Sequence, residues 1–507
     1  MVAHPRKRPA PRSAAWLFAA LAWPAAHAQD AVGSGLTIAP TLTLKETLTS
    51  NRDLSSSDPQ ADAITQVSPG IRISSRAGRV QGSLAYSLNA LAYARASQLN
   101  TLQHSLSADA TAEVVEKHAF INARATVSQQ AISAFGTQGA DGTGLNDSNR
   151  TEVATVSVSP TLRGNLGGWA DFNAGANWTS SSSASTDLGD NSSYSGQVGL
   201  RGRSGPFGWG LNASRQVSDF NLGRTSTTDQ MGGTLTYVPQ YDLQVSLRLG
   251  RSGSDVLTGS RVWQTTSGGG VSWQPTDRTQ IALQSDRTYY GRSHSYSFRH
   301  RMARSVWSYT DTESVSTPSA QSSVQPLTLY DLLYNICLAS GGDAAGCDTA
   351  VRDALAQQGL DPNAVVAGGF LNSSITQSRS QNLAVSYAAL RTTFTVSVFR
   401  TTTSALGQVE PVSGDLAQGV PVRQVGATLG ASHRLAPGTS LTLTATQRKT
   451  LDSGAQLGNQ QRTVTLGYSM SPGPRSSLTL TARHTQFEST TNPYHESALI
   501  ASLGLRF

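Results

Sequence analysis

The sequence predicts an all-β protein, a transmembrane antiparallel up-and-down β-barrel of about 20–22 strands with a short helical insert. Three observations lead to this fold class. Apolar residues alternate with polar ones over strand-length segments, short turns alternate with long polar loops, and the N-terminus resembles an export signal.

The alternation of side chains is the strongest of these signals. Ala170, Phe172 and Trp178 share one face of a strand, whereas Asp171 and Asn173 lie on the other. The same pattern recurs at 102–114, 194–202, 243–249, 425–431, 464–470 and 478–482. Each segment has roughly ten to fifteen residues, which suits a tilted membrane strand better than the five to six typical of soluble sandwiches. We therefore expect the apolar face to meet lipid and the polar face to line a wet lumen.

The connections between these segments alternate in length. Short turns are expected at 76–79, 164–168, 204–206, 239–242, 275–278, 436–438 and 472–474. Long polar loops are expected near 50–63, 129–150, 179–192, 218–228, 402–422, 450–460 and 486–495. A barrel with tight periplasmic turns and longer outer loops has this order, whereas a soluble β-protein, the alternative, has no reason to keep it.

The parity of the strands locates an irregularity. Our count from the sequence is about 21 strands, but a single-chain barrel with both ends in the periplasm needs an even number. Counts made forward from residue 35 and backward from Phe507 disagree between 287 and 380. A barrel of 20 or 22 strands is therefore expected.

Composition supports an all-β chain and gives no reason to expect a nucleic-acid partner. Charged residues are only 14% of the sequence, and Gly, Ser and Thr are abundant. The formal net charge is +7, but it falls to +3 when the basic residues at positions 6–8 and 12 are removed with the signal. The basic balance is therefore no argument for nucleic-acid binding.

The N-terminal segment predicts export. A basic region is followed by an apolar run at 14–22 and by Ala26-His27-Ala28, so cleavage is expected before Gln29. The alternative is a membrane anchor, but the apolar run is shorter than the roughly 20 residues that a spanning helix needs. We expect 1–28 to be a cleaved signal peptide, 29–507 to form the barrel, and the location to be the bacterial outer membrane.

Residues 314–372 are the part that does not resemble strands. Segments 327–337 and 346–359 have the spacing of short amphipathic helices. Cys337 and Cys347 are the only cysteines, and in an oxidising compartment we expect them to form a disulfide. A metal site is disfavoured because no further Cys or His lies nearby in the sequence.

Arginines at polar positions of the strands are the candidate functional residues. We expect a lumen charge ladder of Arg124, Arg201, Arg248, Arg287, Arg299 and Arg301, and Arg163 and Arg215 are also expected to face the lumen. These side chains could guide an anionic polymer or solute. Alternatively, they pair with Asp or Glu on neighbouring strands and stiffen the wall.

Nothing in the sequence indicates an enzyme. The Gly-x-Ser-x-Gly motif is absent, and Ser and His residues are scattered without catalytic spacing. No cofactor is expected either. A barrel hydrolase remains the least favoured hypothesis.

The C-terminal strand, 499–507, looks like the β-signal that the outer-membrane barrel assembly machinery recognises. Leu503, Leu505 and the terminal Phe507 carry this likeness. The resemblance implies that the assembly machinery and outer-membrane lipid are partners of the chain.

Other segments resemble the outer-membrane proteins associated with PEP-CTERM and exosortase systems. The likeness rests on 42–57 (LTLKETLTSNRDLSSS) and 65–73 (TQVSPGIRI), and continues at 84–88, 104–106, 127–132 and 368–371. Members of that Gram-negative family are linked to exopolysaccharide genes, so the resemblance implies polysaccharide export or envelope assembly, with export components as partners. A porin-like diffusion channel for small solutes is the alternative.

Overall fold

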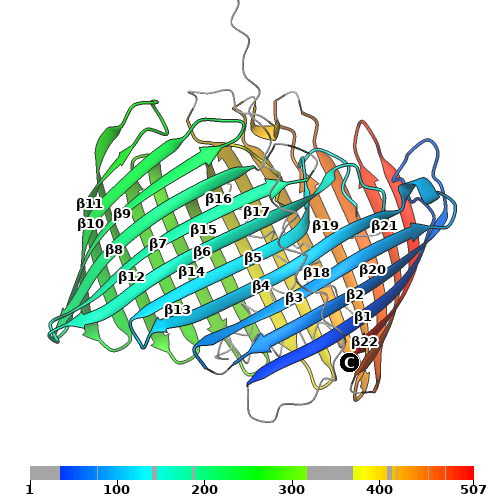
Figure 1. Cartoon of the computed structure of the whole chain (residues 1–507), viewed down its shortest axis with the longest axis horizontal. Helices are drawn as coiled ribbons and strands as arrows, with labels where there is room; N and C mark the ends of the chain where they lie inside the picture. Colours follow the sequence, from blue (N-terminus) through cyan, green and yellow to red (C-terminus); the bar gives the residue numbers. More distant parts are fainter. Residues whose placement is uncertain are drawn as a thin grey trace, which may run out of the picture.

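The described residues fold into one closed barrel. The computed structural model describes residues 35–507 except 77, 140–144, 185, 187, 189, 317–368, 408–413, 418, 455 and 474. They form a 22-stranded antiparallel sheet in which each strand pairs with its neighbours in the chain (Figure 1). The predicted fold class is confirmed, and so is the even strand number.

The strands are long, as tilted membrane strands require. In chain order they are β1 (Leu36–Thr49), β2 (Asp62–Ser75), β3 (Val80–Tyr93), β4 (Thr101–Val115), β5 (Ala119–Ala131), β6 (Arg150–Leu166), β7 (Ala170–Ser183), β8 (Asn191–Ser204), β9 (Phe207–Phe220), β10 (Ser226–Gln240), β11 (Leu243–Ser254), β12 (Val262–Thr276), β13 (Thr279–Thr288), β14 (Gly291–Arg301), β15 (Ser305–Ser316), β16 (Thr376–Ala388), β17 (Thr392–Ala405), β18 (Val422–Ala436), β19 (Thr439–Thr450), β20 (Asn459–Gly473), β21 (Ser476–Glu488) and β22 (Tyr494–Arg506).

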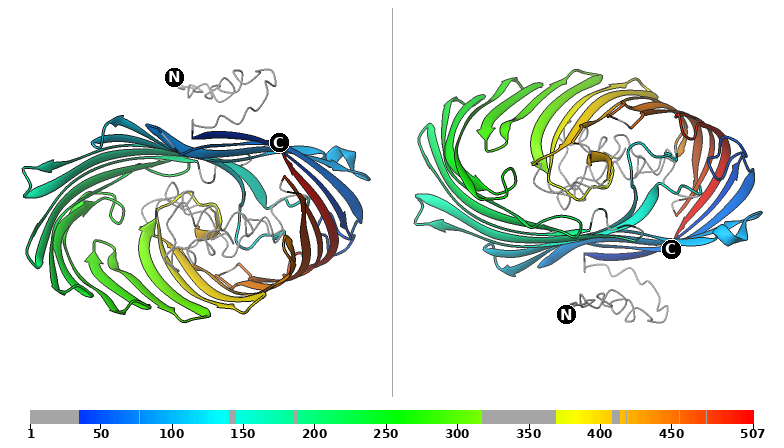
Figure 2. Two further views of the ribbon diagram at one scale, coloured as in Figure 1. Left: turned by 90° about the horizontal axis from the view of Figure 1, so that it is seen from below. Right: turned by 90° about the horizontal axis from the view of Figure 1, so that it is seen from above.

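The first and last strands close the barrel. Leu44 of β1 stands in register with Leu503 of β22, and Leu42 stands in register with Leu505. The backbone N–H of Phe507 donates to the carbonyl of Pro40 at 3.0 Å. Viewed along its axis, the wall encloses a single interior (Figure 2). Closure satisfies the backbone of both edge strands, which is the condition for a sheet to cross a membrane.

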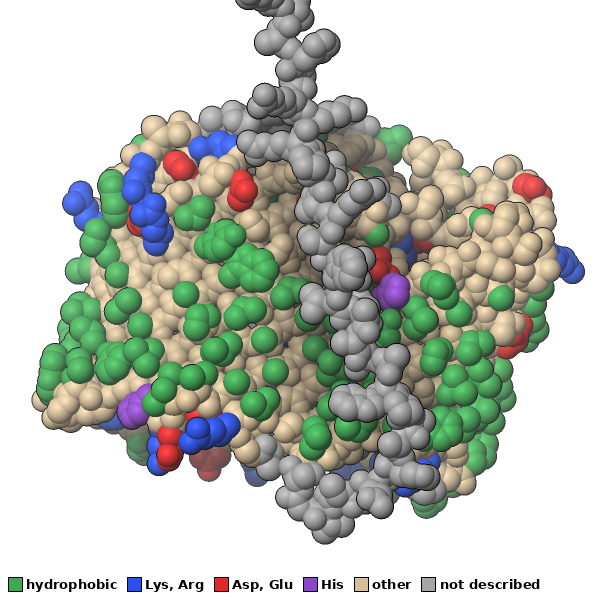
Figure 3. Space-filling view, viewed as in Figure 1, with side chains coloured by type: hydrophobic (Ala, Val, Ile, Leu, Met, Phe, Trp, Pro, Cys, Tyr) green, Lys and Arg blue, Asp and Glu red, His purple; other side chains and the backbone are tan. Residues whose placement is uncertain are grey.

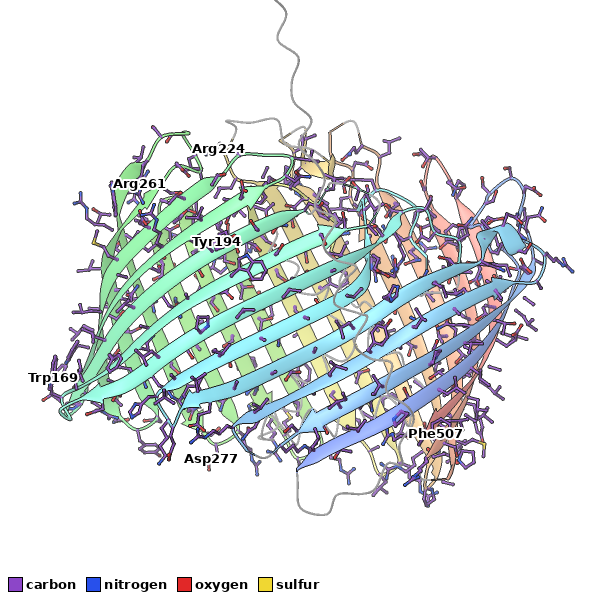
Figure 4. The ribbon with its side chains drawn as sticks, in the orientation of Figure 1. Trp169, Tyr194, Arg224, Arg261, Asp277 and Phe507 are labelled. Carbon is purple, nitrogen blue, oxygen red and sulfur yellow. The ribbon has the colours of Figure 1, made fainter. Side chains whose placement is uncertain are left out.

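The two ends of the barrel differ in their connections. At one end, here called the turn end, short turns join the strands, and glycines such as Gly205 and Gly438 adopt positive φ there. Phe507 also lies at the turn end (Figure 4). At the opposite, loop end the connections are long, with one exception. β13 and β14 are joined there by Tyr289 and Tyr290 alone. This tight turn interrupts the alternation of short and long connections, and it lies within the region where the two strand counts disagreed.

The two faces of the wall differ as the alternation predicts. Large exposed apolar side chains lie on the outer face, as in Leu211, Leu247, Phe394, Leu443 and Leu499. The lumen face is mostly polar, and many of its polar side chains are buried, as in Thr155, Ser181, Ser193, Ser252, Thr442 and Thr485. Green apolar side chains are spread over the outer wall in Figure 3. This apolar-out, polar-in pattern is that of a membrane barrel.

Helical structure is scarce in the part of the chain described. It consists of two 3-10 turns, Ser97–Leu99 and Gly414–Leu416. Among the described residues, no helix is long and apolar enough to cross a membrane. The predicted insert began too early, because 314–316 belong to β15, and 369–372 are not helical. Its remaining residues, Cys337, Cys347 and the predicted signal 1–28 lie outside the described residues.

The buried apolar clusters lie at the loop end. One combines Leu54 with Ile64, Tyr93, Phe487 and Tyr494. The others are centred on Phe220, Val256, Tyr289 and Ile375, and on Ala134, Leu416 and Val422. Each joins residues of several loops to strand ends. The loops are therefore packed against each other and against the wall.

Candidate functional site

Basic side chains outnumber acidic ones on the lumen face. Cross-strand register fixes which side chains share that face. On the described strands its basic residues are Lys45, Arg72, Arg124, Arg163, Arg201, Arg203, Arg248, Arg299, Arg301, Arg434, Arg448, Arg483 and Arg506. Its acidic residues are Asp62, Asp109, Glu113, Asp171, Asp286 and Glu496. The wall therefore presents a net positive charge to the interior.

Four of these charges lie in one cross-strand row, which we call the charged row. It consists of Asp171 on β7, Arg201 on β8, Arg248 on β11 and Asp286 on β13. Gly210 and Thr234 connect Arg201 to Arg248 in register. Because the strands are tilted, a row perpendicular to them runs obliquely from the turn end toward the loop end.

Each arginine of the charged row is paired with the aspartate at the nearer end of the row. Arg201 Nε lies 3.5 Å from Asp171 Oδ2, and both side chains are largely exposed to the lumen. Arg248 Nε lies 2.8 Å from Asp286 Oδ1, although β12 separates their strands. Gly268 makes that contact possible, since a Cβ there would lie 1.8 Å from Asp286 Oδ1.

A pocket of about 270 Å³ opens beside the middle of the charged row. Its lining includes Gly199, Gly210, Asn212 and Thr234. A Cβ on Gly199 would lie 2.6 Å from Asn173 Oδ1. The absence of a side chain at Gly199 therefore leaves room for the pocket on the lumen face. Arg201 and Arg248 stand three strands apart, which is about 14 Å. The pocket thus offers amide and hydroxyl groups between two guanidiniums, a chemistry suited to a hydrated anion.

The structure places five of the six arginines of the predicted ladder on the lumen face, but they do not form one ladder. Arg201 and Arg248 belong to the charged row, whereas Arg124 stands in register opposite Asp109 on β4. Arg299 Nη1 donates to Gln280 Oε1 at 3.0 Å, and Arg301 lies two residues closer to the turn end. Pairing with carboxylates, the alternative interpretation, is confirmed for Arg201 and Arg248.

Two arginines expected in the lumen lie on the outer face instead. Arg287 shares its face of β13 with Leu283, and Arg215 shares its face of β9 with Leu211. The lumen prediction is therefore wrong for both. The physical reason is that both lie near the loop end, beyond the apolar part of the strand, where an outward charge is not exposed to hydrocarbon.

The connection between β5 and β6 turns inward and narrows the lumen. Its cyan backbone crosses the interior in both views of Figure 2. The carbonyl of Gln138 accepts from Tyr494 OH at 2.5 Å and from Gln461 Nε2 at 2.7 Å. The carbonyl of Ala134 accepts from Thr450 Oγ1 at 3.0 Å and from Asn459 Nδ2 at 3.1 Å. This inward loop, the described part of 132–149, is thereby bound to the wall formed by β19, β20 and β22.

Asp415 anchors the inward loop from another direction. Its carboxylate accepts from Ser133 Oγ at 2.7 Å and from the backbone N–H of Ala134 at 2.6 Å. Burial raises the pKa of the Asp415 carboxyl above its usual range, while these two hydrogen bonds act in the opposite direction. The anchor therefore joins two loops that are far apart in the sequence through one buried acid.

A buried ion pair that sequence reasoning missed lies on the lumen face nearby. Arg483 of β21 and Glu496 of β22 are joined by two hydrogen bonds of 2.9 and 3.2 Å, and Thr49 Oγ1 donates to the same carboxylate. Both charged side chains are almost fully buried. The alternation of β22 contained the signal, because Glu496 lies on the face opposite Leu499.

The residues predicted as an assembly signal lie at the seam of the barrel. Leu503 and Leu505 point to the outer face and stand opposite Leu44 and Leu42 of β1. Phe507 follows β22 and is 59% exposed. The terminal aromatic ring is therefore accessible at the turn end (Figure 4).

No protein-family model matches the chain, and no curated protein sequence matches it. Solved structures with a similar course of the chain are outer-membrane proteins. One is the FrpB iron transporter from Neisseria meningitidis (F5-1 variant, apoprotein form), with 12% identity, TM-score 0.49, and 92% of this chain and 81% of that chain covered.

Two further structures illustrate the range. The siderophore receptor PiuA from Acinetobacter baumannii has 8% identity and TM-score 0.48, covering 92% of this chain and 82% of its own. An anion-selective porin from Comamonas acidovorans has 10% identity and TM-score 0.33, and the match covers 93% of this chain and 99% of the porin chain. At these identities and TM-scores the likeness does not identify a ligand for this chain.

The described residues include no group of three or more His, Cys, Asp or Glu side chains placed to hold a metal ion. The arrangement that remains is a polar, net-basic lumen with a charged row, a small pocket beside it and an inward loop. Such a wall can attract, sieve and pass a hydrated anion.

Proposed function

We propose that this chain is an outer-membrane channel whose lumen favours anionic, hydrated solutes. The turn end would face the periplasm and the loop end the exterior, as short and long connections do in outer-membrane barrels. The outward apolar face of the closed barrel supports the membrane location. The excess of basic side chains on the lumen face is the observation that carries the preference for anions.

The charged row would act as the selective part of the path. Asp171 and Asp286 hold Arg201 and Arg248 in place and leave the interval between the arginines free of carboxylates. An anion moving obliquely along the wall would meet first one guanidinium and then the other, with Asn212 and Thr234 between them. Binding that is multi-site and individually weak permits passage.

The inward loop would set the size limit. It is bound to the opposite wall through Gln138 and Ala134, so it narrows the lumen near the loop end. Small solutes would pass beside it, whereas larger ones would need the loop to move.

Solute flux into proteoliposomes tests this function. We expect an anionic hexuronate to enter faster than a neutral hexose or a cationic hexosamine of similar size. The double variant Arg201→Gln/Arg248→Gln should reduce that preference by roughly threefold or more. Arg462→Gln, on the outer face and paired with Glu488, is the matched control and should behave as the wild type. Equal flux of the three sugars through the wild type would contradict the proposal.

A role in exopolysaccharide export is the second candidate. It rests on the resemblance of 42–57 and 65–73 to exosortase-associated barrels, and a net-basic lumen would suit an acidic polymer. Deletion of the gene should then trap polymer in the periplasm, and normal surface polymer in the deletant would count against it. Export, cleavage before Gln29 and assembly by the barrel machinery remain predictions of the sequence.

A further inference from the structure

A cluster of charged and aromatic side chains lies on the outer face near the loop end. It consists of Arg215 on β9, Asp229 on β10, Arg251 on β11, Arg261 directly before β12, and Trp263 in β12. We call it the basic patch. Basic side chains, drawn in blue, gather with acidic ones, drawn in red, at the upper left of Figure 3, where Figure 4 labels Arg261. An outward cluster of this kind plays no part in conduction through the lumen.

The basic patch has more positive than negative charge. Arg215 Nε lies 3.7 Å from Asp229 Oδ1, and Arg261 binds Asp229 Oδ2. The Arg261 guanidinium also lies 5.7 Å from the centre of the Trp263 ring. Arg251 stands in register with Met231 of β10 on the same face. Two guanidiniums therefore contact one carboxylate, and Arg251 adds a third guanidinium on the same face of the wall.

An apolar groove of about 870 Å³ leads away from the basic patch over the outer face. Its floor is a cross-strand row in which Pro160, Ala176 and Gly196 lead to Arg215. A Cβ built on Gly196 would meet nothing within 4 Å. The small residues of this row therefore leave a furrow in a wall that elsewhere carries large apolar side chains.

Larger side chains border the furrow. Trp178 and Tyr194 stand in register with each other on one side, and Val198 lies on the other. All three are substantially exposed on the outer face. Tyr194 is labelled on the front wall in Figure 4. The furrow is thus an elongated apolar track that ends at guanidiniums.

We propose that the basic patch and the groove bind a phosphorylated glycolipid of the outer leaflet. Its phosphate would be bound by Arg215, Arg251 and Arg261, since guanidinium and phosphate form charge-assisted, often bidentate hydrogen bonds. One of its acyl chains would lie in the groove over Gly196. The assignment to the outer leaflet rests on the orientation given under the proposed function. Guanidiniums that face outward at the membrane surface, beyond the hydrocarbon, attract an anionic headgroup at the same level.

The test is native mass spectrometry of the purified barrel, titrated with defined lipids. The probes are diphosphorylated lipid A, its dephosphorylated form and phosphatidylglycerol. We expect the wild type to retain diphosphorylated lipid A in preference to both others. The variant Arg215→Gln/Arg251→Gln should weaken that binding by roughly tenfold.

Two further variants separate ligand binding from a structural role. Asp229→Asn removes the competing carboxylate and should strengthen binding of the diphosphorylated lipid, whereas a purely structural ion pair predicts no gain. Gly196→Leu adds a side chain to the groove, with a Cβ that would meet nothing within 4 Å, and should weaken binding. Gly269→Leu, on the outer face of β12 outside the groove, and Arg462→Gln are the controls and should bind as the wild type.

Equal retention of the dephosphorylated lipid, or of phosphatidylglycerol, would overturn the assignment. So would a patch variant that binds like the wild type while forming a different oligomer, because that result identifies the face as a contact between copies of this chain. The anion preference of the lumen and lipid binding on the outer face are tested by separate measurements. The patch variants should keep the solute preference of the wild type, and loss of that preference in the wild type would leave lipid binding untouched.

Discussion

Arg248 on β11 and Asp286 on β13 form an ion pair of 2.8 Å across the intervening strand β12. Gly268 occupies the position between them, in register with both. The absence of a side chain at Gly268 is what allows two strands that do not pair to exchange a charge contact. The contact holds Arg248 on the lumen face, in register with Thr234, which lines the pocket in the lumen.

Gly268→Ala should break this pair. The added Cβ would lie 1.8 Å from Asp286 Oδ1, so the carboxylate must move and Arg248 loses its partner. A less neutralised guanidinium should increase the preference for anions in reversal-potential measurements. Gly269→Ala is the control, because its Cβ would have only an ordinary 3.5 Å contact with the Ser246 carbonyl. An unchanged preference in Gly268→Ala would argue against a role for the charged row.

Asp415 should make anchoring of the inward loop depend on pH. Its folded pKa is raised by burial, so the anchor is strongest below the ordinary pKa near 3.8 and weakens as pH rises through the raised value. Protease cleavage within the inward loop should therefore increase with pH across that window. Asp415→Asn imitates the neutral acid and should abolish the dependence. The same pH profile in wild type and variant would contradict this assignment.

The buried pair of Arg483 and Glu496 should be important for stability. Arg483→Gln leaves the buried Glu496 carboxylate without its cation, which typically costs about 3–5 kcal/mol. Arg462→Gln breaks a half-exposed pair and should cost less than about 1 kcal/mol. Thermal unfolding in detergent compares the two. Similar losses for both variants would show that the buried pair has no special role.

Phe507→Ala should separate assembly in cells from folding in detergent. The ring is largely exposed and its backbone N–H keeps its bond to Pro40, so the folded barrel should lose little stability. If the C-terminal strand is an assembly signal, membrane-inserted protein should fall several-fold. Refolding of the purified variant in detergent should match the wild type. Normal insertion in cells would contradict the assembly-signal prediction.

The architecture could be predicted from the sequence because it depends on local periodicity. Alternation assigned the faces of β4, β7 and β8 correctly, and parity required an even number of strands. The two-residue turn at Tyr289 and Tyr290 was harder to recognise, because tyrosine favours strands and the loop end otherwise carries long connections. The irregularity nevertheless fell within the region in which the counts conflicted.

The site could be predicted only in part because it depends on register and on distant contacts. That Arg201 and Arg248 share one row follows from the pairing of four successive strands, which no local pattern reveals. The bond from Ser133 to Asp415 joins residues 282 positions apart. Arg215 and Arg287 were misplaced because a polar residue near the loop end can face outward without contacting hydrocarbon.

A net-basic lumen that favours anions should determine the reversal potential of the wild-type channel in a planar bilayer under a salt gradient. We expect a potential of the sign that shows anion preference, shifting toward zero in Arg201→Gln/Arg248→Gln. A cation-selective wild-type channel, or a double variant as anion-selective as the wild type, would contradict it.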